Sequence, residues 1–166
     1  MRNTSNSLRS PRPAKPGFCG FRGVKAGSLL DYNLCMASTQ SSTQKNVLGQ
    51  PMETCGCEPM TGFFRDGCCN TGPDDLGLHT VCCIVTEKFL AMSARLGNDL
   101  STPMPQFGFP GLKPGDRWCV CAARWLQVQR AGAPCPVVLE ATHEATLEVV
   151  PFEILLAYAV IPETLH

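Results

Sequence analysis

LHTVCCIVTEKFLAMSARLG, residues 78–97, is the stretch that decides the fold class. Its first eight residues, 78–85, are nearly all apolar or β-branched, which predicts a buried strand. Thr86 is a suitable N-cap for a helix, and Gly97 is a suitable stop. The apolar residues between them recur at the spacing of one helical face: Phe89, Leu90, Met92 and Leu96. A strand that leads directly into an amphipathic helix favours a domain with both kinds of element.

The sequence on either side adds further elements of both kinds. A long loop with four prolines covers 98–115 and enters a strand through a turn at 113–116. Residues 46–75 are rich in Gly, Pro, Cys and Asp, so we expect an irregular but ordered segment with Phe63 and Phe64 as apolar anchors. Strands are expected over 117–124, 136–142 and 146–150, and helices over 125–131 and, after Pro151, 152–159. The chain therefore predicts one α+β domain, a mixed β-sheet with packed helices and two long ordered loops.

Composition places the limits of this domain at 46–161. Residues 1–45 hold Ser, Thr, Asn, Pro and Arg with no apolar period, which predicts a disordered tail or a targeting segment. Met36 is a plausible alternative start, so 1–35 is either a transit segment or an upstream extension. Residues 162–166 are expected to form a short C-terminal tail.

Charge is unevenly spread along the 166 residues, although the formal net charge is zero. From Asn46 onward there are seven basic residues and thirteen acids, a formal net of −6. An acidic domain has no basic stripe for a phosphate backbone, so no nucleic acid partner is expected. No apolar run approaches the roughly 18 residues of a membrane span, and polar residues at 31–33 argue against a signal peptide. We therefore expect an intracellular protein, cytoplasmic or organellar, with no membrane association.

Four blocks of unusual sequence carry a family resemblance. They are TGFFRDGCCNTG (61–72), GNDLSTP (97–103), FPGLKPGDRWCVCA (109–122) and VLEATHE (138–144). With these blocks the chain resembles the domain-of-unknown-function family numbered 2237 over about 46–161. That family has no assigned activity, so the resemblance implies no catalytic residues.

A thiol-nucleophile site is the first candidate for chemistry. The eleven cysteines are odd in number and, without a secretory signal, are expected to be reduced thiols or metal ligands rather than bridges. Cys68 and Cys69 lie in a glycine-flanked loop directly after Arg65 and Asp66, and His79 follows ten residues later. A nearby Arg favours the thiolate, and a histidine within reach acts as base. The alternative is that both cysteines are structural and that Arg65 pairs with Asp66.

Metal binding is the second candidate, with zinc as the cofactor. The C-x-C pairs at 55–57 and 119–121 are weak signals, because the C-x₂-C spacing of common zinc fingers is absent. Cys119 and Cys121 are two apart on an expected strand, so they would point to the same side. The candidate ligands are Cys55, Cys57, Cys68, Cys69, His79, Cys82, Cys83, Cys119 and Cys121.

Polar residues at loop ends form a third group, because rigid scaffolds mount binding groups there. His143 beside Glu144 would make an acid–base pair. The alternative is turn and capping chemistry, with Arg117 and Arg124 pairing with acids. The expected ligand-binding residues are Arg65, Asn70, Asn98, Asp99, Asp116, Arg117, His143 and Glu144, with Ser101, Thr102 and Thr142 in the same group.

The leading hypothesis is a domain that binds a small molecule or performs thiol-dependent catalysis, although the sequence does not decide whether it is an enzyme. Its pocket would lie between the loop 65–79, the loop 98–103 and the strand end at His143. Cys68 or Cys69 would be the reactive thiol, His79 the base, and Arg65 or Arg117 the anion clamp. Asp66 completes the expected catalytic group. The alternative is a zinc-stabilised structural or protein-interaction module.

Overall fold

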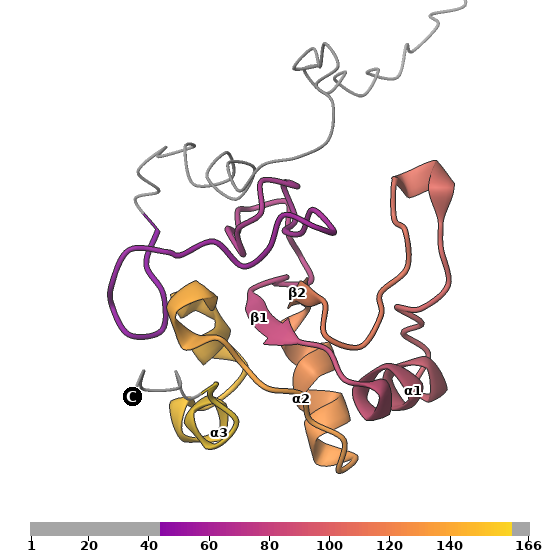
Figure 1. Cartoon of the computed structure of the whole chain (residues 1–166). Helices are drawn as coiled ribbons and strands as arrows, with labels where there is room; N and C mark the ends of the chain where they lie inside the picture. Colours follow the sequence, from indigo (N-terminus) through magenta and orange to yellow (C-terminus); the bar gives the residue numbers. More distant parts are fainter. Residues whose placement is uncertain (1–43, 161–166) are drawn as a thin grey trace, which may run out of the picture. The chain divides into compact units, whose positions relative to one another are not determined.

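The computed structural model describes residues 44–160 (Figure 1). The helices and strands are β1 (Val81–Ile84), α1 (Glu87–Arg95), β2 (Arg117–Val120), α2 (Ala122–Arg130) and α3 (Phe152–Ala157). Short 3₁₀ helices lie between them: η3 (Pro105–Phe107), η4 (Leu139–Ala141) and η5 (Glu144–Glu148). The expected tail up to residue 43, with Met36, and the C-terminal tail 162–166 lie outside the described residues. None of the helices within 44–160 is long and apolar enough to cross a membrane.

The α+β class is confirmed, but the sheet is smaller than the sequence predicts. β1 and β2 pair antiparallel with Cys82 opposite Cys119. The strand expected over 136–142 is wrong: Val137 makes isolated bridges on either side, and the chain then turns into η4. The hydroxyl of Thr142 causes this turn, because it donates to the Val138 carbonyl (2.8 Å) and accepts from the Cys82 N–H (3.1 Å). The strand expected over 146–150 is also wrong, since most of it lies in η5.

The helix expectations hold better than the strand expectations. Helix α1 begins after Thr86, whose hydroxyl accepts from the Phe89 N–H (3.2 Å), and Gly97 with φ of +83° follows its end. The strand expected over 117–124 stops at Val120, because Cys121 becomes the N-cap of α2 and the Ala122 N–H donates to the Leu78 carbonyl (2.9 Å). Helix α3 follows Pro151 as expected.

Alternate residues of β1 face two different cores, because neighbouring side chains on a strand point to opposite sides. Val81 and Cys83 belong to the larger core, which also contains the buried Trp118 and Trp125. Cys82 points the other way into a smaller core. This smaller core consists of Cys55, Cys69, Cys82, Cys119, Val138 and Ala141. Four of its six members are cysteines, so its cohesion depends on sulfur chemistry.

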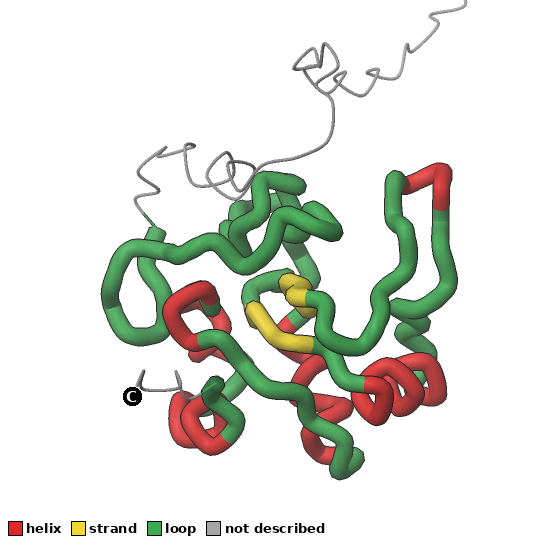
Figure 2. Tube along the Cα trace, in the orientation of Figure 1, coloured by secondary structure: helices red, strands yellow, loops and turns green. Residues whose placement is uncertain are grey.

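Residues 46–75 form the expected irregular segment, which contains only isolated bridges and turns (Figure 2). Phe63 and Phe64 do not anchor it, since they remain 38% and 53% exposed and pack edge-on against each other. Thr61 anchors it instead: this residue is fully buried, and its hydroxyl accepts from the Cys119 N–H (2.8 Å). Polar bonds to β2 therefore replace the apolar contacts that the sequence predicted.

Gly62 offers a test of how tightly this segment is packed. A Cβ at Gly62 would overlap the carbonyl oxygen of Cys68, whereas a Cβ at Gly97 would meet nothing within 4 Å. Both glycines have a left-handed φ, +93° and +83°, so the conformational cost of alanine is similar. We expect Gly97→Ala to lower the free energy of unfolding by about 1 kcal/mol and Gly62→Ala by about 1–3 kcal/mol more, measured by urea unfolding. Equal losses would show that the segment is not packed as described.

Candidate functional site

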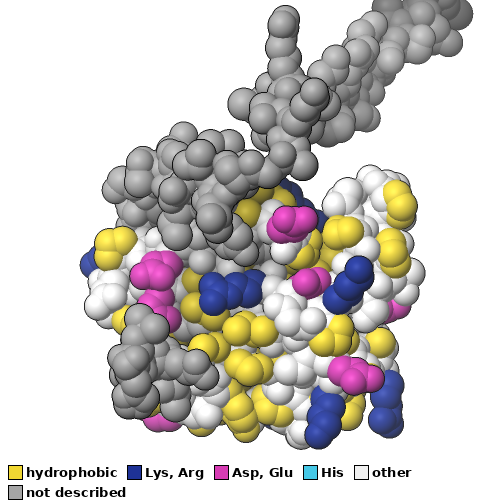
Figure 3. All heavy atoms as spheres, viewed as in Figure 1, with side chains coloured by type: hydrophobic (Ala, Val, Ile, Leu, Met, Phe, Trp, Pro, Cys, Tyr) yellow, Lys and Arg dark blue, Asp and Glu magenta, His cyan; other side chains and the backbone are white. Residues whose placement is uncertain are grey.

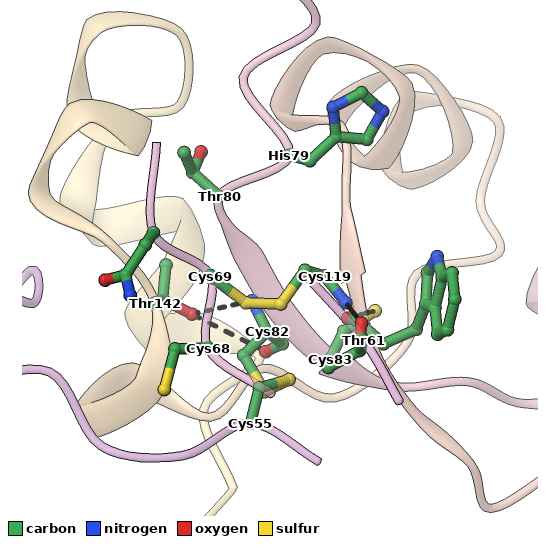
Figure 4. Close-up of a disulfide and its surroundings, with 12 residues drawn as sticks. Cys55, Thr61, Cys68, Cys69, His79, Thr80, Cys82, Cys83, Cys119 and Thr142 are labelled. Carbon is green, nitrogen blue, oxygen red and sulfur yellow. Dashed lines mark hydrogen bonds between the residues drawn. A yellow bond between two sulfur atoms is a disulfide. The ribbon is translucent and has the colours of Figure 1, made fainter. Parts of the chain in front are cut away.

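Two disulfides join the irregular segment to the sheet (Figure 4). Cys55 is bonded to Cys82 of β1, and Cys69 is bonded to Cys119 of β2. All four residues are at most 2% exposed. The expectation of reduced thiols rather than bridges is therefore wrong for these four, and Cys69 offers no free thiol. Within residues 44–160 the free thiols are those of Cys68, Cys83, Cys121 and Cys135.

Cys68 is held in a turn that does not activate it. Asp66 accepts from the Cys68 N–H (3.0 Å) and from the Asn70 amide (2.9 Å), so Asp66 and Asn70 fix the loop. Burial raises the pKa of the Cys68 thiol, the charge of Asp66 raises it further, and a hydrogen bond from Thr54 lowers it. In Figure 4 Cys68 points away from both disulfides, and His79 lies on their other side. The structure thus corrects the expectation that Cys68 or Cys69 acts together with His79.

His79 has a different partner, the buried carboxylate of Asp75. His79 Nδ1 lies 2.6 Å from Asp75 Oδ1, and the side chains are 43% and 0% exposed. Asp75 Oδ2 also accepts from the His79 N–H (2.8 Å) and from the Thr71 hydroxyl (3.1 Å). Phe63 stacks against the imidazole, with ring centroids 6.0 Å apart. The ring is therefore held in one orientation with one nitrogen committed to Asp75.

The strand register brings a free thiol to the same end of the sheet. Val81 pairs with Val120, so the residues just before β1 lie beside the residue just after β2. Cys121 is that residue: it is half-buried, and its Sγ lies 2.6 Å from the Gly77 carbonyl oxygen. The His79 ring packs on Gly77, because a Cβ there would meet His79 Cε1 at 2.7 Å. Gly77 is thus in contact with both the thiol and the imidazole.

A cavity of about 280 Å³ opens between these residues and the long loop 98–115. Most of its wall is apolar, from Phe63, Leu100, Met104, Phe107, Phe109, Trp118 and Val120. Its polar groups are Arg65, His79 and Asn98, with Cys119 and Cys121 as the sulfur-bearing residues. Figure 3 shows apolar side chains exposed on the protruding arm that carries η3, where Phe107 is 69% exposed. An apolar cavity with a few polar groups is the usual form of a small-molecule site.

Arg65 lies over the aromatic wall of this cavity. Its guanidinium carbon is 4.9 Å from the centroid of the Trp118 ring, and one of its nitrogens donates to the Met60 carbonyl (3.2 Å). Cation–π contact and a single backbone bond leave other N–H groups of the guanidinium available for a ligand. The residue has φ of +56°, a left-handed conformation that is uncommon outside glycine. Arg65 does not depend on Asp66 for a charge partner in this arrangement.

The polar residues expected at loop ends serve mostly as turn and cap groups. Asp99 accepts from the Thr102 hydroxyl (2.6 Å) and from the N–H groups of Ser101 and Thr102, and these bonds lower the pKa of its carboxyl. Asp116 accepts from the Lys113 N–H (2.8 Å). Only Asn98 of the loop 97–103 block lines the cavity with a polar side chain, and its amide also donates to Ser93. Arg117 and Glu144 are exposed outside the cavity, and Arg124 donates to the Leu96 carbonyl. Of the three segments expected around the pocket, the loops 65–79 and 98–103 both line the cavity, and the segment at His143 does not.

His143 lies apart from the cavity and caps η5. The residue is 6% exposed, and its Nδ1 accepts from the Ala145 N–H (3.0 Å) while Nε2 is buried without a partner within 44–160. Burial lowers the pKa of His143, and the charges of Glu144 and Glu148 partly oppose this. His143 beside Glu144 is thus a structural cap rather than part of the site with His79.

Sequence reasoning missed two residues of the site. Asp75 was overlooked, although it precedes His79 by four residues and therefore offered a local signal. Cys121 was considered only as a metal ligand, because the strand was expected to continue past it. Both errors concern the ends of β1 and β2. Among the expected metal ligands, Cys55, Cys69 and Cys119 have sulfur atoms within 4.8 Å of one another.

Fold and site together define a small, cysteine-rich α+β domain with an aromatic cavity at one end of a two-stranded sheet. Residues 45–159 match the family described as an uncharacterised protein conserved in bacteria, domain of unknown function 2237. The chain belongs to this family, as the four sequence blocks indicated. No curated protein matches the chain.

The depressed pKa of His143 predicts an acid-sensitive fold. The native state favours the neutral imidazole of His143. Below the ordinary histidine pKa of about 6.5 the unfolded chain therefore binds more protons than the native state, and the free energy of unfolding decreases as the pH is lowered. His143→Asn keeps a cap acceptor and does not titrate. We expect wild type to lose more unfolding free energy than His143→Asn between about pH 7.5 and about pH 5.5, measured by urea unfolding. Parallel losses in both proteins would remove His143 as the cause.

Proposed function

We propose that this domain binds a small molecule and performs thiol-dependent chemistry on it, with Cys121 as nucleophile, His79 as base and Asp75 as the group that orients the base. The observation that carries the proposal is the convergence of Cys121 and His79 on one cavity, linked through Gly77. A nucleophile, a base and a buried carboxylate behind the base are the recurring parts of thiol catalysis.

The position of Cys121 supports its role as the nucleophile. It is the N-cap of the nine-residue helix α2, and thiolates at helix N-termini are stabilised by the helix dipole. Cys83 and Cys135 are fully buried, and Cys68 lies outside the cavity. Among the free thiols of residues 44–160, Cys121 is the one that borders the cavity.

The hydrogen bond between Asp75 and His79 defines how a proton would move. Nδ1 faces the Asp75 carboxylate, so Nε2 is left to take the proton of the Cys121 thiol as the sulfur attacks an electrophilic carbon. The imidazolium that forms is stabilised by the buried carboxylate. The same Nε2–H then returns the proton to the leaving group. Leu78, directly before His79, has φ of +47°, and such strained residues cluster at functional sites.

The cavity wall indicates the kind of ligand. Its aromatic and aliphatic lining suits an apolar or aromatic body, which the side chains of Phe109 and Trp118 would contact. The guanidinium of Arg65 suits a carboxylate or another anion on the same ligand. A volume of about 280 Å³ limits the bound part to a small molecule or one side chain of a larger substrate.

Two expectations from composition accompany this proposal. An acidic domain gives no reason to expect a nucleic acid partner. An intracellular setting, cytoplasmic or organellar, stays a prediction that rests on the sequence before residue 46. The zinc-stabilised module is supported by a different set of residues, the sulfurs of the two disulfides.

Alkylation with iodoacetamide, followed by peptide mass spectrometry, tests the reactive thiol. We expect Cys121 to be labelled at least roughly tenfold faster than Cys68 at neutral pH, and His79→Gln to slow that labelling roughly tenfold. Asp75→Asn is expected to slow the labelling as well, because it removes the carboxylate that holds His79. Asp74 is exposed, so Asp74→Asn is the matched control and is expected to leave the rate unchanged.

The proposal fails if Cys121 resists alkylation in the native protein, or if His79→Gln and Asp75→Asn leave its rate unchanged. Cys68→Ser is the control for the thiol itself, because it removes a half-buried thiol outside the cavity. A Cys68→Ser variant that loses the fast label would move the nucleophile back to the loop 61–72.

A further inference from the structure

The two disulfides bring three sulfur atoms close to one another and hold a fourth next to them. The Sγ atoms of Cys55, Cys69 and Cys119 all lie within 4.8 Å of one another, and the sulfur of Cys82 is bonded to that of Cys55. Figure 4 shows the two disulfides side by side. Their residues are between 0% and 2% exposed.

The frame that holds these sulfurs does not consist of the disulfides alone. Cys82 and Cys119 are direct partners across the β1–β2 register, so their side chains point to the same face. Cys55 and Cys69 come from a loop closed by backbone bonds from the Cys55 and Gly56 N–H groups to the Gly67 carbonyl (2.8 and 3.1 Å). The bond from the Cys119 N–H to the Thr61 hydroxyl fastens this loop onto β2. These bonds hold the loop against β2 in addition to the two S–S bonds.

We propose that in the reduced protein these four thiolates, Cys55, Cys69, Cys82 and Cys119, bind one Zn²⁺ ion. Tetrahedral zinc with Zn–S bonds of about 2.3 Å places its sulfurs about 3.8 Å apart. The sulfurs of Cys55, Cys69 and Cys119, which lie within 4.8 Å of one another, are close to that spacing. The sulfur of Cys82, which is bonded to that of Cys55, would separate from it on reduction to complete the set. A closed set of four thiolates is the ligand set of structural zinc sites. The ion would fasten the loop to the sheet as the two disulfides do. This inference stands independently of the proposed catalytic role of Cys121.

The conversion between the disulfide form and the zinc-bound, reduced form is balanced in atoms and electrons. Two molecules of a small dithiol reduce the two disulfides to four protein thiols and become two disulfides themselves; Zn²⁺ then displaces four protons from the thiols. In the reverse direction, two molecules of hydrogen peroxide take four electrons from the tetrathiolate and, with four protons, give two disulfides, free Zn²⁺ and four waters. Zinc itself does not change its oxidation state.

Cys83 supplies a matched control for this site. It follows Cys82 directly and is just as buried, but it points into the larger core on the opposite face of β1. There burial, aggravated by the neighbouring Cys135, raises the pKa of the Cys83 thiol well above its usual value. A metal that uses the proposed four sulfurs should depend on Cys82 and not on Cys83.

Zinc binding to the reduced full-length chain tests the proposal. The protein is reduced with a dithiol under nitrogen, freed of reductant, supplied with Zn²⁺ and analysed by elemental mass spectrometry. We expect about one zinc per chain for wild type and Cys83→Ser, and at least roughly tenfold weaker binding for Cys82→Ser. Replacement of zinc by Co²⁺ is expected to give the absorption of tetrahedral, thiolate-bound cobalt.

Labelling of wild type keeps the test decisive if Cys82→Ser fails to fold. With zinc bound, Cys55, Cys69, Cys82 and Cys119 are expected to resist N-ethylmaleimide while Cys68 and Cys121 react, and a chelator is expected to expose all four. The proposal is overturned if reduced wild type binds no stoichiometric zinc, or if the cysteines that the chelator exposes are a different set; the buried Cys83 and Cys135 are expected to stay unlabelled in both states. Retention of tight zinc binding by a folded Cys82→Ser variant would overturn it as well.

Discussion

The cross-link between the irregular segment 46–75 and the two-stranded sheet is the constraint on which the rest of this fold depends. A sheet of two short strands is marginal on its own, and here one of its faces is covered by loop rather than by a helix. The disulfides Cys55–Cys82 and Cys69–Cys119 span 27 and 50 residues. In the chain-entropy model, loops of these lengths stabilise by about 3.5 and about 4 kcal/mol if each is taken singly. Thr61 adds the polar contact that sets the position of the loop on β2.

The candidate site follows from the same sheet. β2 carries Cys119 into the cross-link and, two residues later, delivers Cys121 to the start of α2. β1 begins two residues after His79, and the antiparallel register places that end of β1 beside the end of β2. The cross-linked loop in turn supplies Phe63 and Arg65 to the cavity. The same two strands thus carry a buried sulfur cluster, which holds the loop to the sheet, and lead to a cavity that Cys121 and His79 both line.

Local signals predicted much of the fold, whereas the partners of single side chains could not be predicted. Thr86, Gly97 and Pro151 mark helix limits through backbone chemistry within a few residues, and the structure has helices there. No strand forms at 136–142, because the Thr142 hydroxyl donates to the Val138 carbonyl and accepts from the Cys82 N–H of β1. Thr142 and Cys82 are 60 residues apart in the sequence, so no local pattern predicts this bond. The bond between Cys55 and Cys82 is also non-local, because the two residues are 27 apart in the sequence. The number of cysteines allows several pairings and does not select this one. For the site, the loops around Arg65, His79 and Asn98 were expected, but the thiol among them was not.

Peptide mapping of the air-purified protein without reductant tests whether two disulfides fasten the segment 46–75 to the sheet. Free thiols are blocked with N-ethylmaleimide, the chain is digested, and linked peptides are identified by mass spectrometry before and after reduction. We expect one linked pair that contains Cys55 and Cys82 and another that contains Cys69 and Cys119, with Cys68 and Cys121 blocked as free thiols. A bond from Cys55 or Cys69 to any other cysteine would contradict this expectation, because the loop would then be fastened to the sheet at different points.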